Sequence, residues 1–294
     1  LYEASLNGTR VGDFVLAPGS SSYDKRLQVQ TYDVTELLRP GENLAEVILG
    51  DGWYRSCSGV DGDRNLYGED VALYFQLEVD EKAACLSDES WEATQDGPIR
   101  MNDMQQGEIV DARREPLSGW HGVRVEDFGI DNLCASNCVP VTEHERFAGK
   151  IITTPNGDTV IDFGQNMVGW PEFDVAGEKG AHVMVRFAEM LNDSGEKARG
   201  NDNPKGSVYT INYRSAKAKL QCVLSDKPKN HVRPTFTFYG FRYIEFTADA
   251  DITVSALNGD VVGSDTVETG SIETSHKKVN KLISNILWGQ RGNY

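Results

Sequence analysis

Five acidic side chains within twenty residues form a group of carboxylates that could do chemistry. Paired carboxylates transfer protons when one is protonated and the other ionised, and carboxylates in a rigid loop also bind calcium. Because Asp and Glu in turns commonly cap backbone amides, a structural role in loops is the simpler interpretation, with calcium or sugar binding as the alternatives. The five residues are Asp51, Asp61, Asp63, Glu69 and Asp70.

Aromatic and planar polar side chains in the same part of the chain could bind a carbohydrate. A sugar is recognised by an aromatic ring that stacks on its C–H groups and by a few polar side chains that hold its hydroxyls. The candidate carbohydrate-binding residues, all in or beside predicted loops, are Trp53, Tyr54, Asp24, Asn65 and Tyr67. Since tryptophan is highly buried on average, the alternative is that Trp53 anchors the core or the boundary between two domains.

The cysteines and histidines lack the spacing of a metal site. Five cysteines are irregularly spaced, and Cys134 and Cys138 form a CxxxC pair without a second pair. Because structural zinc needs four converging ligands, we predict no metal or cofactor other than the calcium that the first β-domain could hold. Irregular thiols slightly favour a reducing compartment such as the cytoplasm, and nothing else in the sequence indicates a location.

The charge of the chain argues against two classes of partner. Acidic residues outnumber basic ones by 45 to 29, which gives a net charge of -16. Such a chain repels phosphate backbones and anionic lipid, so we predict no nucleic acid and no membrane partner, while a neutral sugar is compatible. No stretch approaches the ~20 apolar residues of a membrane helix. The sequence starts at Leu1 without Met or a signal-peptide pattern, so we expect the natural N-terminus upstream.

The elements that must position these residues are mostly short strands. Asn7-Gly8 between two apolar runs predicts a hairpin, and residues 71–79 place alternate apolar side chains on one face. A second run of strands is predicted between residues 151 and 257, interrupted by a polar loop at 195–206. Regular short strands with turn residues between them predict β-sandwiches or jelly rolls rather than βαβ units.

The periodicity changes near the C-terminus. Apolar residues spaced by three, four and seven define one face of a helix within residues 271–294; they are Ile272, Val279, Leu282, Ile283, Ile286 and Leu287. The predicted fold class is therefore all-β. It comprises a jelly-roll domain at 1–142, a second β-sandwich at 143–262, and a linker with a helix at 263–294.

Several short motifs, in this order, resemble bacterial α-L-rhamnosidases. Leu6-Asn7-Gly8-Thr9-Arg10-Val11-Gly12 and Gly50-Asp51-Gly52-Trp53-Tyr54-Arg55 resemble the N-terminal jelly-roll domain of that family. Asp162-Phe163-Gly164-Gln165-Asn166-Met167-Val168-Gly169-Trp170 and Tyr239-Gly240-Phe241-Arg242-Tyr243 resemble its next β-domain. Trp288-Gly289-Gln290-Arg291-Gly292-Asn293-Tyr294 resembles the first helix of its (α/α)6 barrel. Each motif is weak alone, and their shared order along nearly the whole chain carries the resemblance.

The resemblance implies a parent enzyme that hydrolyses terminal α-L-rhamnose with inversion. Inverting glycosidases use a general acid and a general base about 6.5–9.5 Å apart. In this family that pair follows the first barrel helix, so we assign no catalytic residue in this chain. The resemblance implies accessory β-domains that are inactive alone, with the missing catalytic barrel of the same chain as their partner and a rhamnose-containing carbohydrate as the ligand.

Two alternatives stay open at this point. The first is a free-standing carbohydrate-binding or adhesin module, which should end in a strand or a polar tail rather than in an amphipathic helix. The second concerns the polar run Asp162-Phe163-Gly164-Gln165-Asn166. It is interpreted as a bulge or tight turn, and the alternative is a loop that borders the substrate cleft of the barrel.

Overall fold

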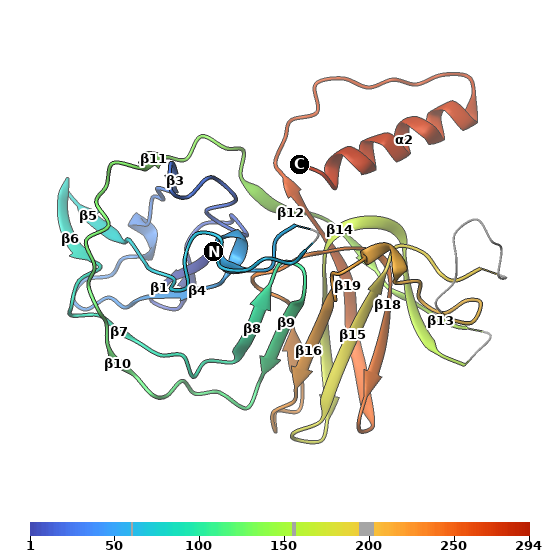
Figure 1. The fold of residues 1–294 in the computed structure, drawn as a ribbon, viewed down its shortest axis with the longest axis horizontal. Coiled ribbons are helices and arrows are strands. Elements are labelled where there is room, and N and C mark those ends of the chain that lie inside the picture. Colours follow the sequence, from blue (N-terminus) through green and yellow to red (C-terminus); the bar gives the residue numbers. More distant parts are fainter. Residues whose placement is uncertain (60, 155–156, 194–202) are drawn as a thin grey trace.

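The computed structural model describes residues 1–59, 61–154, 157–193 and 203–294. Two β-rich parts lie side by side, and one long helix, α2, lies beside the second part (Figure 1). Residues 195–202 of the predicted polar loop lie outside the described residues. The predicted all-β fold class with a C-terminal helix is confirmed.

The first part of the chain is built from small sheets. One sheet has three antiparallel strands in the order β2-β1-β4, and three further pairs of strands stand apart from it. Asn7 and Gly8 have positive φ angles of 56° and 79° between β1 and β2, as the predicted hairpin requires. The elements are β1 (Tyr2–Leu6), β2 (Thr9–Arg10), β3 (Leu27–Val29), η1 (Thr35–Leu37), β4 (Ala45–Leu49), α1 (Gly52–Arg55), β5 (Gln76–Val79), β6 (Lys82–Leu86), β7 (Glu92–Ala93), β10 (His121–Gly122) and β11 (Leu133–Ala135).

The alternating run at 71–79 is only partly a strand. Leu73, Phe75 and Leu77 are half-buried while their neighbours are exposed, as the alternation predicts. Hydrogen bonding to β6 covers only β5, and Val79 is 45% exposed. The alternation predicted over 71–79 is thus present, but only Gln76–Val79 forms a strand, in a two-stranded sheet with β6.

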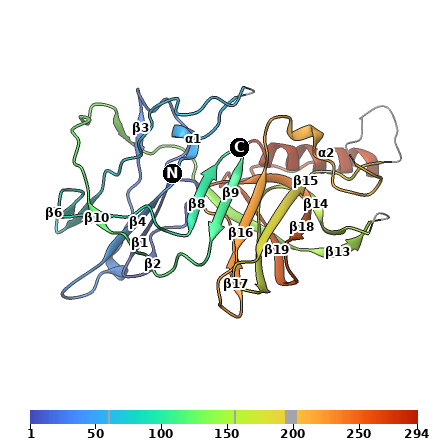
Figure 2. The same cartoon turned by 60° about the horizontal axis from the view of Figure 1, so that its bottom comes forward.

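The second part is one curled sheet of ten strands. Eight of them follow the order β12-β19-β14-β18-β15-β16-β9-β8, while β13 and β17 pair with β14. The long strands bend the sheet around its own core, as both views show (Figure 2). The elements are β8 (Ile99–Asp103), β9 (Gly107–Asp111), β12 (Val141–Ala148), β13 (Lys150–Thr153), β14 (Thr159–Gly177), β15 (His182–Ala188), η2 (Ile211–Tyr213), β16 (Lys219–Val223), β17 (Asn230–Val232), β18 (Tyr239–Ala248) and β19 (Ile252–Ser264).

Alternating apolar side chains fill this core. Val183, Val185 and Phe187 of β15 are buried and point to one face of the sheet, since successive side chains in a strand point to opposite faces. Phe187 stacks on Tyr239 with ring centroids 3.7 Å apart and contacts Phe241 edgewise at 5.3 Å. These rings belong to the main apolar cluster of the second part.

The second part takes two of its strands from the first half of the chain, and a small core joins the two parts. Strand β9 pairs in parallel with β16, which brings β8 and β9 into the large sheet although they precede the predicted boundary at 142/143. Val15 and Leu16 of the first part pack on Trp170 and Val262 of the second. The boundary itself stays a prediction, because strand pairing does not divide a chain into domains.

Helix α2 (Lys277–Arg291) confirms the predicted C-terminal helix. Its inner side packs Trp288 against Phe147 at 5.8 Å, and Arg291 pairs with Glu145 at 2.7 Å. The other side carries the apolar stripe Val279, Leu282 and Ile286, which are 40%, 57% and 59% exposed. Among the residues that the structure describes, no helix has the length and apolar character to cross a membrane.

Candidate functional site

Four of the five predicted carbohydrate-binding residues lie in one region of the first part. The rings of Tyr54 and Tyr67 are stacked at 6.0 Å, and buried Tyr23 meets them edgewise at 5.6 and 5.0 Å. Asp24 follows Tyr23 and is exposed, with Lys25 3.5 Å away. Asn65 is exposed and donates its backbone N–H to Arg55 O at 3.2 Å.

Trp53 is separate from these residues in its contacts. It is half-buried, lies 6.3 Å from Phe238 and packs with the core that joins the two parts. This placement favours the alternative in which Trp53 anchors the boundary between domains.

Two of the tyrosine rings stack on each other and are also partly exposed. Tyr54 and Tyr67 turn their faces together at an interplanar angle of 29°, and Tyr67 is 37% exposed. A ring that stacks on another ring offers a sugar at most its other face. Nothing in the sequence indicated Tyr23, because only the fold brings it edgewise against the other two rings. Carbohydrate binding by the five predicted residues therefore stays a prediction.

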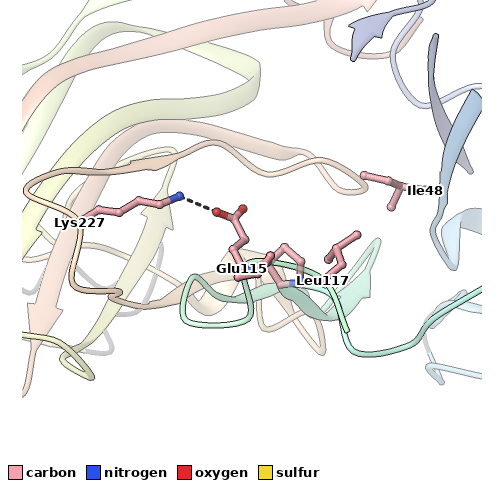
Figure 3. A pocket seen from close by; sticks show the side chains of 6 residues that line it. Ile48, Glu115, Leu117 and Lys227 are labelled. Carbon is pink, nitrogen blue, oxygen red and sulfur yellow. Dashed lines mark hydrogen bonds and ion pairs between the residues drawn. The ribbon is translucent and has the colours of Figure 1, made fainter. Parts of the chain in front are cut away.

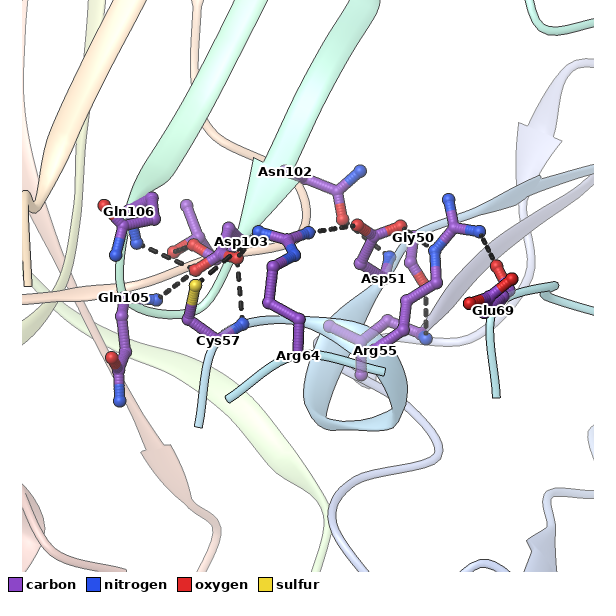
Figure 4. A network of polar contacts seen from close by, with 12 residues as sticks. Gly50, Asp51, Arg55, Cys57, Arg64, Glu69, Asn102, Asp103, Gln105 and Gln106 are labelled. Atoms are coloured by element: carbon purple, nitrogen blue, oxygen red, sulfur yellow. Dashed lines mark hydrogen bonds and ion pairs between the residues drawn. The ribbon is translucent and has the colours of Figure 1, made fainter. Parts of the chain in front are cut away.

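Asp51, one of the five clustered acidic residues, lies in a charged network (Figure 4). Asp51 accepts a hydrogen bond from Arg55 Nε at 2.6 Å and pairs with Arg64 Nη2 at 3.3 Å. Arg64 Nη1 also donates to Asp103 Oδ2 at 2.6 Å. Two guanidinium groups thus neutralise two carboxylates where the loop that follows β4 meets the hairpin β8–β9.

Asp103 is the buried end of this network, with a side chain that is 0% exposed. Its carboxylate accepts the backbone N–H groups of Cys57, Gln105 and Gln106 at 2.8–2.9 Å. Burial alone would raise the pKa of Asp103, but these backbone hydrogen bonds outweigh it and hold the pKa below its ordinary value. Asp103 is therefore an ionised, fixed partner for Arg64.

The geometry gives calcium binding no support. Asp61, Asp63, Glu69 and Asp70 are exposed, and Asp51 is already paired with arginines. Calcium requires six to eight oxygen ligands around one point. Within the described ranges, no three His, Cys, Asp or Glu side chains converge as a metal site requires. Calcium in the first domain remains an untested prediction.

Replacing Arg64 by alanine is expected to destabilise the chain by about 1–2 kcal/mol. The variant removes a charge-assisted hydrogen bond from buried Asp103, and such bonds contribute ~1.5–3 kcal/mol. We expect a smaller loss here because Arg64 is 43% exposed and water screens its charge. Urea unfolding measures the difference. The matched control is Arg124→Ala, because Arg124 is 75% exposed and its ion pairs are with exposed Asp70 and Glu126. We expect a loss under ~0.5 kcal/mol there, and equal losses in both variants would contradict this role of Arg64.

A groove of about 590 Å³ lies where the two parts meet (Figure 3). Its walls are mainly apolar, and one ion pair joins Lys227 Nζ to Glu115 Oε2 at 2.5 Å. The lining residues are Ile48, Pro98, Glu115, Pro116, Leu117 and Lys227. None of the predicted carbohydrate-binding residues lines it.

Two protein-family models together match most of the chain. Residues 1–152 match the alpha-L-rhamnosidase N-terminal domain, and residues 152–263 match the bacterial alpha-L-rhamnosidase concanavalin-like domain. The chain belongs to the bacterial α-L-rhamnosidase family. The resemblance inferred from the short motifs is therefore confirmed. The models meet at residue 152, ten residues beyond the predicted boundary at 142.

Curated α-L-rhamnosidases align with the whole of this chain. A Streptomyces avermitilis α-L-rhamnosidase is 39% identical over 100% of this chain and 29% of its own length. A Formosa agariphila α-L-rhamnosidase is 36% identical over 100% of this chain and 32% of its own length. The chain thus spans about a third of the length of the curated relatives that it matches.

Solved α-L-rhamnosidase structures share the fold. The native enzyme from Aspergillus terreus superposes with a TM-score of 0.89 at 35% identity, over 100% of this chain and 35% of that one. The Streptomyces avermitilis α-L-rhamnosidase complexed with L-rhamnose superposes with a TM-score of 0.88 at 37% identity, over 100% of this chain and 29% of that one. The β-domains of this chain are thus rhamnosidase domains in fold as well as in sequence.

Proposed function

We propose that this chain is the non-catalytic β-scaffold of an enzyme that removes terminal α-L-rhamnose from a carbohydrate with inversion. The observation that carries the proposal is the pair of matched domains. One is the N-terminal domain and the other the concanavalin-like domain of the family, and the chain spans only about a third of the length of its curated relatives. The partner in this proposal is the catalytic domain of the same protein.

The contacts of the buried carboxylates support this proposal. An inverting glycosidase needs one protonated and one ionised carboxyl group about 6.5–9.5 Å apart, with water and substrate between them. Asp103 holds Arg64, Glu108 accepts backbone N–H groups, and Asp260 pairs with Arg146 at 2.6 Å. Each of these three groups has a partner within the protein, and we assign the proposed general acid and base to the catalytic domain of the enzyme.

The outer side of α2 supports the proposed partner. Val279, Leu282 and Ile286 form an exposed apolar stripe on the side of the helix away from Trp288. Exposed apolar patches mark interaction surfaces, and the spacing of three and four residues suits packing against another helix. The alternative of a free-standing binding module gives this stripe no role.

An activity assay tests the proposal. We expect purified residues 1–294 to release no aglycone from an aryl α-L-rhamnoside above the background rate, and turnover would refute the proposal.

A chimaera tests the scaffold role directly. Residues 1–294 would replace the aligned segment of the Streptomyces avermitilis α-L-rhamnosidase, to which they are 39% identical. We expect the chimaera to hydrolyse the aryl rhamnoside within about tenfold of the unmodified enzyme. A folded but inactive chimaera would contradict the scaffold role.

A further inference from the structure

Two carboxyl groups lie against each other where β12, β14 and β19 meet. Asp260 of β19 is opposite Arg146 of β12 in the strand register, and its side chain is 3% exposed. Glu172 of β14 is 22% exposed and is a hydrogen-bond neighbour of Asp260. Arg146 Nε lies 2.6 Å from Asp260 Oδ1, and Arg146 Nη2 pairs with Glu172 Oε2. One guanidinium group thus binds two carboxyl groups, which are called the Asp260–Glu172 pair below.

The strands are irregular at this point. The pairing of β12 with β19 shifts register between Glu143 and Arg146, and the pairing of β14 with β19 shifts between Glu172 and Asp174. Bulges change the direction in which side chains point. The two shifts therefore allow side chains from three strands to converge on one place, which a regular ladder does not do.

Among the described residues, nothing donates a hydrogen bond to Asp260 Oδ2, which is buried from solvent. Its neighbour Glu172 can only accept hydrogen bonds when it is ionised. A proton on Asp260 Oδ2 supplies what is missing, because this oxygen then donates to Glu172 while Oδ1 keeps its bond to Arg146. In agreement with this geometry, burial and the neighbouring Glu172 raise the pKa of Asp260 to about 6.

The charged surroundings do not neutralise the pair when both of its groups are ionised. Its carboxylates and those around it outnumber the lysine and arginine side chains. Loss of the proton therefore leaves two adjacent negative charges that share Arg146, and like charges in contact repel each other. The groups linked to the pair by charge, besides Arg146, are Glu143 of β12, Asp174 of β14, Lys229, His231 and Arg233 in or beside β17, and Glu3 of β1.

Strand β12 connects this pair to the rest of the molecule. At its start, Val15 of the first part donates its N–H to Val141 O at 2.9 Å. Near its end, Phe147 packs against Trp288 of α2 at 5.8 Å. Because β12 is an edge strand of the large sheet, its pairing with β19 holds both of these contacts in place.

We propose that the Asp260–Glu172 pair is a pH-sensitive switch that fixes β12 to the large sheet when Asp260 is protonated and loosens β12 when Asp260 is ionised. The closed strand binds this proton more tightly than the open strand, in which Asp260 has its ordinary pKa of 3.8. The stabilisation is complete below pH 3.8 and is lost as the pH rises through 6. Between pH 5 and pH 7 the opening of β12 should increase about tenfold.

Hydrogen exchange of residues 1–294, followed by mass spectrometry, tests the proposal. We expect the protection factors of peptides from β12 to fall about tenfold from pH 5 to pH 7. They should also be lower than those of peptides from β15, because an edge strand that opens locally exchanges before the whole chain unfolds.

Two variants keep the shape of the pair and remove its proton. Asp260→Asn and Glu172→Gln each place an N–H donor between the two side chains, so the protection of β12 should become independent of pH in both. Glu245→Gln is the matched control, because Glu245 is a buried carboxylate that accepts a hydrogen bond from Arg186 Nε at 2.8 Å. Histidine side chains change charge in the same pH range, so His231→Gln is the second control. Both controls should keep the tenfold change.

Three results would overturn the proposal. The first is equal protection of β12 at pH 5 and pH 7 in the unmodified chain. The second is a pH dependence that survives in Asp260→Asn and Glu172→Gln, or that disappears in His231→Gln. The third is equal protection of β12 and β15, which would mean that β12 opens only when the whole chain unfolds. None of these measurements depends on the proposed function.

Discussion

Gly107→Ala is expected to destabilise the chain by at least ~4 kcal/mol or to prevent folding. Gly107 has a φ of 105°, which L side chains rarely adopt. A Cβ atom there would lie 1.8 Å from Lys219 O, a backbone atom of the strand that pairs with β9. Both strands would have to separate, and the parallel pairing that joins β8 and β9 to the other strands of the large sheet would be lost. Urea unfolding, with far-ultraviolet circular dichroism as the signal, measures the loss.

The control for this prediction is Gly289→Ala in helix α2. A Cβ atom at Gly289 would meet no atom within 4 Å, and its φ is not in the positive region. Alanine is favoured over glycine within a helix by ~1 kcal/mol, so this variant should be neutral or slightly more stable. If Gly107→Ala unfolded at the same urea concentration as Gly289→Ala, the close approach of β9 to β16 at Gly107 would not be needed for the stability of the chain.

Local patterns predicted the elements whose structure depends on near neighbours. Asn7-Gly8 adopts the backbone of its predicted turn because the required positive φ angles are available to these two residues. The helix predicted within 271–294 exists, but it starts at Lys277. Asn280 Oδ1 accepts the N–H and the hydroxyl of Thr274, which holds the residues before the helix in a non-helical turn. Such side-chain competition with the backbone is difficult to read from apolar spacing alone.

Contacts between distant residues could not be predicted in this way. Periodicity indicates which face of a strand is buried, but it does not say which strand lies beside it. The parallel pairing of β9 with β16 joins residues more than one hundred positions apart. For the same reason Arg64 gave no sign of its bond to Asp103, and Tyr23 gave none of its contacts with Tyr54 and Tyr67. The family resemblance came from ordered motifs, which need no knowledge of these contacts.

Glu108→Gln is expected to flatten the pH dependence of stability between pH 5 and pH 8. Glu108 of β9 is fully buried, and its carboxylate accepts the N–H groups of Thr235 and Phe236 at 2.9–3.1 Å. Burial raises its pKa to about 7, although these backbone bonds and Arg233 act in the opposite direction. In the unfolded chain the pKa is near 4.5.

The sign of the effect follows from proton binding. Between pH 4.5 and pH 7 the folded chain holds a proton on Glu108 that the unfolded chain has released. The contribution of this proton to the free energy of unfolding is therefore complete below pH 4.5 and is lost as the pH rises through 7. Over pH 5 to 8 the unmodified chain should therefore lose about 2–3 kcal/mol more stability than Glu108→Gln, which carries no titrating group at this position. Urea unfolding at both pH values measures this difference. Asp260, whose pKa burial raises to about 6, is present in both proteins and cancels in the comparison. Parallel pH profiles would mean that Glu108 is ionised in the folded chain at pH 5, so that the backbone N–H groups of Thr235 and Phe236 outweigh its burial.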